Sequence, residues 1–68
     1  MNEEAFNLSV RKFLKSFGVN AQREIELAVA KARARGTVAG SETLPAKVTV
    51  QIAGVNLNWE FEGDIALG

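Results

Sequence analysis

The stretch KVTVQIAGVNLNWEFE, residues 47–62, alternates apolar and polar side chains along almost its whole length. Such alternation, rich in β-branched and aromatic residues, predicts two half-buried strands. Ala53 and Gly54 between them predict a tight turn, because glycine readily supplies a positive φ. A hairpin centred on this dipeptide places Lys47 opposite Glu60. On its other face it pairs apolar residues with apolar ones: Ile52 with Val55, Val50 with Leu57, and Val48 with Trp59.

The residues before this hairpin show helical spacing. Five apolar side chains fall within a sector of about 100° on a helix: Phe6, Val10, Phe13, Leu14 and Phe17. Asn2 suits an N-cap, and Gly18 suits the left-handed residue that ends many helices. We therefore expect a first helix over residues 3–17.

A second helix is expected over residues 21–35. Asn20 suits its N-cap and Gly36 its end. Its apolar stripe is poorer in bulk than that of the first helix and consists of Ala21, Ile25, Ala28, Val29 and Ala32. Alanines on this stripe would allow close approach of the two helices.

The predicted fold is α+β, with two N-terminal helices packed on one face of a C-terminal antiparallel β-hairpin. The apolar face of a hairpin needs a covering layer, and the helices can provide it. Residues 1–68 then form a single domain, with a loop at 36–46, the hairpin at 47–62 and a tail at 63–68. The sequence does not decide whether residues 37–39 or 64–67 add a short third strand. Trp59 lies on the covered face and is expected to be buried.

Composition narrows the possible chemistry. The 68 residues include no His, Cys or Tyr, so the chain can form no disulfide and a zinc site is improbable. The commonest general base and the commonest thiol nucleophile are also missing. We therefore expect no enzyme, no catalytic or metal-binding residues and no cofactor.

The charges are balanced overall but unevenly distributed. Eight basic and eight acidic residues give a net charge of zero, whereas nucleic-acid-binding domains usually carry a basic excess. Residues 1–35 hold seven basic and four acidic residues, and 36–68 hold one and four. The basic end of the second helix, with Lys31, Arg33 and Arg35, is thus a candidate for binding an anion. Nucleic-acid binding through it is the alternative function.

The outer side of the second helix offers a candidate partner surface. Leu27 lies far from the main apolar stripe, and Ala30 and Ala34 join it in a narrow stripe of Leu and small residues. A short domain without cross-links gains stability from oligomerisation. We therefore expect an unknown protein partner or a homodimer at this surface.

No segment is apolar enough over about 20 residues to predict a membrane span. No signal peptide is recognisable at the start, and the lack of Cys is compatible with a cytoplasmic location.

Four segments carry a resemblance that covers nearly the whole chain: MNEEAFNLSVRKFLK at 1–15, FGV at 17–19, QREIE at 22–26 and ETLPA at 42–46. They resemble a family of short uncharacterised bacterial proteins. The resemblance implies a bacterial protein without an assigned activity, and it assigns no functional residues. The prediction is therefore a small intracellular interaction module without catalysis.

Overall fold

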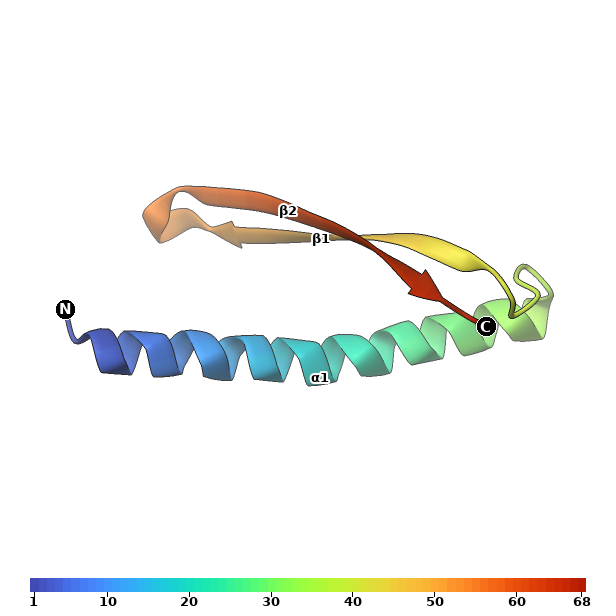
Figure 1. Ribbon diagram of the computed structural model, residues 1–68, viewed down its shortest axis with the longest axis horizontal. Coiled ribbons are helices and arrows are strands. Elements are labelled where there is room, and N and C mark those ends of the chain that lie inside the picture. Colours follow the sequence, from blue (N-terminus) through green and yellow to red (C-terminus); the bar gives the residue numbers. More distant parts are fainter. The chain divides into compact units, whose positions relative to one another are not determined.

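The first 37 residues form one unit built on a single helix, α1, which runs from Glu3 to Arg35 (Figure 1). The computed structural model describes all 68 residues. The start of α1 is as predicted: Asn2 is extended, and its side-chain oxygen accepts a hydrogen bond from the Ala5 N–H at 3.0 Å. Glu3 and Glu4 in the first turn suit the positive end of the helix dipole.

The prediction of two helices, 3–17 and 21–35, is wrong because α1 continues through residues 18–20. Gly18 is helical and does not cap. Asn20, the expected second N-cap, instead donates from its side-chain amide to the Ser16 carbonyl oxygen at 2.7 Å, one turn back in the same helix. A helical glycine costs about 1 kcal/mol relative to alanine, which a long run of strong helix formers on both sides can offset.

The end of α1 has the geometry predicted for Gly36. This residue is left-handed, with φ 76° and ψ 14°. Its N–H donates to the Arg33 carbonyl oxygen at 3.1 Å, and the Thr37 N–H donates to that of Ala32 at 3.0 Å. These two bonds form a Schellman motif. The Thr37 hydroxyl adds a third bond to the Ala32 carbonyl oxygen, so the last turn is well satisfied.

Residues 38–68 form the second unit, an antiparallel hairpin. Strand β1 spans Thr43–Ile52, a short 3₁₀ turn, η1, spans Ala53–Val55, and strand β2 spans Leu57–Ala66 (Figure 1). The sheet is therefore longer than the predicted 47–62, because residues 43–46 of the expected loop pair with 63–66 of the expected tail. Residues 64–66 extend β2, and no strand forms at 37–39.

The register differs from the prediction by two residues. Ile52 pairs with Leu57, Val50 with Trp59 and Val48 with Phe61, while Lys47 is opposite Glu62. A two-residue shift leaves every side chain on its predicted face, because side chains alternate with period two. The observed register also pairs Leu44 with Ile65 and Ala46 with the small Gly63.

The turn explains the shift. The loop has four residues, 53–56, and its left-handed position is Asn56, with φ 54° and ψ 39°. Asn56 N–H donates to the Ala53 carbonyl oxygen at 3.1 Å. Gly54 has no positive φ, so the prediction that it supplies one is wrong. Asparagine tolerates the left-handed region better than most residues.

Pro45 fits the ladder without loss of a hydrogen bond. Leu67 N–H donates to the Glu42 carbonyl oxygen at 2.8 Å, which makes this pair a hydrogen-bonded one. Antiparallel pairs alternate between hydrogen-bonded and non-hydrogen-bonded. The N–H of a residue at position 45 would therefore point to the open edge of β1, where proline is tolerated.

Glycine substitutions test the single helix. Gly18→Ala should stabilise α1 by about 1 kcal/mol, since a methyl group at residue 18 meets nothing within 4 Å. Gly36→Ala is the matched control and should destabilise by a similar amount, because its φ of 76° disfavours a Cβ. Circular dichroism melts of both variants measure the changes. A destabilising Gly18→Ala would contradict the continuous helix.

A second pair of substitutions tests the turn. Asn56→Ala should destabilise the hairpin by about 1 kcal/mol, because alanine pays more than asparagine for the left-handed region. Gly54→Ala should have a smaller effect, since residue 54 has an ordinary φ and a Cβ there meets nothing within 4 Å. Amide hydrogen exchange of β1 and β2 reports both. A larger loss of stability for Gly54→Ala than for Asn56→Ala would favour the two-residue turn predicted from the sequence.

Candidate functional site

One continuous apolar stripe runs along α1, and we call it the helix stripe. Its members are separated by steps of 4, 4 and 3 residues, which is an 11-residue repeat: Phe6, Val10, Leu14, Phe17, Ala21, Ile25, Ala28 and Ala32. They fall within a sector of about 100° around the helix. The two stripes predicted for separate helices thus overlap in phase across Gly18, with Phe13 and Val29 just outside the sector, one beyond each margin. That shared phase is the sequence signal that could have identified the single helix.

The helix stripe is exposed to solvent at its large residues. Phe6, Phe17 and Leu14 keep 52%, 44% and 55% of their surface exposed, and α1 contains no buried residue. The repeat has about 3.67 residues per turn, close to the natural 3.6. The stripe therefore follows the helix axis with little drift for about 39 Å at 1.5 Å per residue.

The hairpin presents a second apolar surface, the apolar sheet face. It consists of Leu44, Ala46, Val48, Val50, Ile52, Leu57, Trp59, Phe61 and Ile65. Trp59 and Phe61 lie with ring centroids 5.7 Å apart, a favourable tilted contact. Trp59 is 52% exposed, so the expectation of a buried tryptophan is wrong. Its neighbours within the hairpin lie beside it, and a two-stranded sheet supplies none above it.

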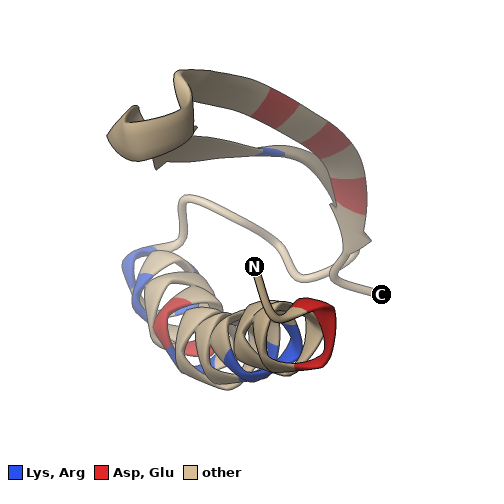
Figure 2. Cartoon of the chain, turned by 90° about the vertical axis from the view of Figure 1, so that its left-hand side faces the viewer, with Lys and Arg blue, Asp and Glu red and all other residues tan.

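The opposite face of the hairpin is mostly polar, and three of its four charged residues are acidic. Lys47 Nζ lies 3.9 Å from a carboxylate oxygen of Glu60, diagonally across the strands, since Lys47 is directly opposite Glu62. Figure 2 shows the acidic segments along β2 and the basic segments concentrated on α1. An exposed ion pair such as Lys47–Glu60 contributes little to stability.

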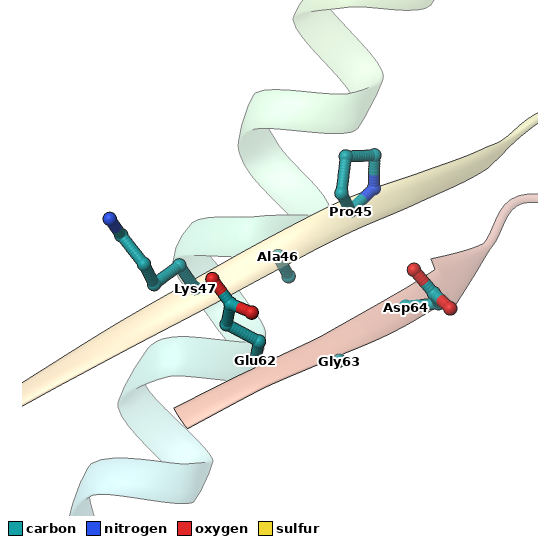
Figure 3. A pocket seen from close by; sticks show the side chains of 6 residues that line it. All are labelled: Pro45, Ala46, Lys47, Glu62, Gly63 and Asp64. Carbon is teal, nitrogen blue, oxygen red and sulfur yellow. The ribbon is translucent and has the colours of Figure 1, made fainter. Parts of the chain in front are cut away.

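A shallow depression in the hairpin lies around the Ala46–Gly63 pair (Figure 3). The side chains of Pro45, Lys47, Glu62 and Asp64 complete its lining. It lies on the polar face between the Pro45–Asp64 and Lys47–Glu62 pairs, and the backbone of Ala46 and Gly63 forms its floor because the side-chain positions of this pair point to the opposite face. The depression is open, and Lys47 on β1 lies directly opposite Glu62 on β2 beside it. No group of three His, Cys, Asp or Glu side chains is placed to hold a metal ion.

The loop before β1 is organised by a carboxylate. Both oxygens of Glu42 accept hydrogen bonds from the Ala39 N–H, at 2.8 and 3.1 Å. One of them also accepts from the Gly40 and Ser41 N–H groups, at 2.8 and 3.1 Å. Consecutive N–H groups directed at one anion form a backbone nest. Sequence analysis missed this role of Glu42.

The nest affects the acidity of Glu42. The hydrogen bond from Ala39, followed by those from the backbone of Glu42 itself, Gly40 and Ser41, holds the pKa of this carboxyl below its usual 4.5. A lowered folded-state pKa means that the ionised carboxylate stabilises the loop above the unfolded-state pKa. This contribution is lost as the pH falls through the folded-state pKa.

An acid titration tests the nest. The amide proton resonances of Ala39 and Gly40 should titrate with a midpoint below 4.5, because these amides donate to Glu42. Glu42→Gln should abolish the titration and increase amide exchange in residues 39–41. Glu60→Gln, which removes an exposed carboxylate of β2, should leave both unchanged. A titration that survives Glu42→Gln would contradict the assignment.

The candidate partner surface predicted from the sequence lies on the side of α1 away from the helix stripe. Leu27, Ala30 and Ala34 are all exposed, and Leu27 keeps 52% of its surface. Residues 27, 30 and 34 are one turn apart and share a face. Their role in binding stays a prediction.

The three basic residues of the anion-binding prediction are not on one side of α1. Arg33 and Arg35 belong to the last turn, where they suit the negative end of the helix dipole. At 100° per residue, Arg33 lies roughly opposite Lys31 and Arg35. Anion binding by these residues stays a prediction.

Comparison with known proteins identifies the family. A model of a family of unknown function, DUF6494, matches residues 1–68, so the chain belongs to this family. The predicted resemblance to an uncharacterised family is confirmed. No curated protein and no solved structure matches the chain. No helix in the structure combines the length and apolar character needed to cross a membrane.

Proposed function

We propose that the chain is a small non-catalytic interaction module of the bacterial cytoplasm, which works by assembling through its apolar surfaces. One observation carries the proposal: the helix stripe and the apolar sheet face both expose large side chains, including Phe6, Phe17, Trp59 and Phe61. Contiguous exposed apolar surface on a soluble protein marks an interaction site.

The architecture of each unit supports this proposal. A single helix and a two-stranded sheet have no interior, so neither unit can bury its own apolar side chains. A chain of 68 residues without Cys or His has no disulfide or zinc site to compensate. Burial of apolar surface stabilises by about 25 cal/mol per Å², so assembly is a large available source of stability.

The balance of charge supports the same proposal. The Met1–Thr37 unit carries seven basic and four acidic residues, and the Val38–Gly68 unit carries one and four. Opposite fields on the two units favour specific orientation of partners over indiscriminate aggregation. The cytoplasmic part of the proposal rests on the lack of Cys, which suits a reducing compartment.

The size of the native assembly tests the function. Tagged full-length chain, produced at its natural level, should elute from a gel-filtration column at a mass well above that of one chain. Trp59→Ala should lower the assembled fraction, because it removes the largest apolar side chain of the hairpin. Glu60→Ala, the next residue on the polar face, should not.

A chain that stays monomeric in the extract would refute the proposal. Assemblies that disperse on nuclease treatment, and whose formation falls steeply with salt, would favour the nucleic-acid alternative.

A further inference from the structure

The helix stripe has a gradient of side-chain size along α1. Its first half carries Phe6, Val10, Leu14 and Phe17, and its second half carries three alanines and Ile25. We propose that this stripe binds the same stripe of a second copy of the chain, with the two helices antiparallel. The inference rests on the proposed function and names the partner.

Size complementarity selects the antiparallel orientation. In an antiparallel pair, a two-fold axis can pass beside residue 19. Two residues, one from each copy, then lie at the same height along the helices when their numbers add to about 38. Val10 is then directly opposite the partner's Ala28 near the centre of the stripe, and Phe6 and Phe17 are level with the partner's Ala32 and Ala21. Leu14 lies beside the partner's Ile25 on the same margin of the stripe. Each large side chain thus meets a small or matching one, as dense packing requires.

A parallel pair would lose this match. It would place phenylalanine against phenylalanine in one half and alanine against alanine in the other. The first half would be crowded, and the second would leave voids, and both faults are destabilising. The gradient of side-chain size therefore favours packing of the stripe against an antiparallel copy of itself. A uniform apolar surface would not match this gradient.

The charges at the two ends of the stripe agree with this orientation. Glu3 in the first turn and Arg35 in the last turn both lie within the sector of the stripe. In an antiparallel pair, Glu3 lies near the partner's Arg35 at each end, whereas a parallel pair brings like charges together. Antiparallel helix dipoles also attract. Between the ends, only Asn7 and Glu24, at the margins of the sector, are polar.

Sedimentation equilibrium of the full chain, with matched substitutions, tests the surface. The wild type should dimerise reversibly. Phe17→Asp should weaken the dimer by about 100-fold or more, the size expected for a central contact, while circular dichroism shows the helix retained. Leu8→Asp, at an exposed position about 150° around α1 from the centre of the helix stripe, should leave the dimer unchanged.

Engineered cysteines test the orientation without disturbing the fold, since the natural chain has none. An oxidised mixture of the Val10→Cys and Ala28→Cys variants should form a covalent dimer joining one of each. Either variant alone should not, because an antiparallel pair separates identical residues by about 27 Å at 1.5 Å per residue. Leu8→Cys alone, about 150° around α1 from the centre of the helix stripe, measures the background from random collision.

Three results would overturn the inference. They are a chain that is monomeric at all concentrations, a dimer broken by Leu8→Asp and not by Phe17→Asp, and efficient cross-linking of Val10→Cys with itself. If one of these results is found but the chain still forms a large assembly with other proteins in the extract, only the antiparallel dimer is refuted. The proposed function then stands. A monomer both in the extract and in purified form would refute both.

Discussion

A lone helix and a lone pair of strands have no inside, and this constraint governs the properties of the whole chain. The large apolar side chains of α1 project from a single helix, and those of the hairpin project from a single two-stranded sheet. Neither element can enclose its own side chains. Backbone hydrogen bonds and caps define both units well. The apolar surfaces that would normally form a core stay exposed at Phe17 and Trp59. Neither unit can bury them by itself, and this is the basis of the proposed assembly.

Local hydrogen bonding accounts for the precision of the backbone in the absence of a core. Asn2 satisfies the first turn of α1, and Gly36 with Thr37 satisfies the last. Glu42 orders the loop that leads into β1 through its backbone nest, and Asn56 closes the hairpin. These contacts span only a few residues each, so their geometry depends little on what covers the apolar surfaces. The chain thereby presents two ordered apolar faces with defined shape.

Much of this organisation could be predicted from the sequence, and the failures have specific causes. The caps at Asn2 and Gly36, the α+β class and the two faces of the hairpin were predicted correctly. Gly18 followed by Asn20 has the composition of a helix end and a new start, but such residues only lower helix stability by amounts that strong neighbours offset. In contrast, Phe6, Phe17 and Ala28 fall on the same side of one continuous helix, which indicates that the helix is not broken at Gly18. The Glu42 nest escaped prediction because backbone N–H directions are not encoded in a residue pattern.

The sequence by itself determined which side chains share a surface. Periods of about 3.6 and of 2 assign faces whatever the register, so the helix stripe and the apolar sheet face follow directly from residue spacing. Only the three-dimensional structure decided where the hairpin turns and how far it extends. Registers two residues apart expose the same faces, so alternation cannot distinguish them. The choice depends on Asn56 adopting a left-handed backbone and on the pairing of residues 43–46 with 63–66. Those are contacts between residues up to 23 positions apart in the chain, and they form only when the chain folds back on itself.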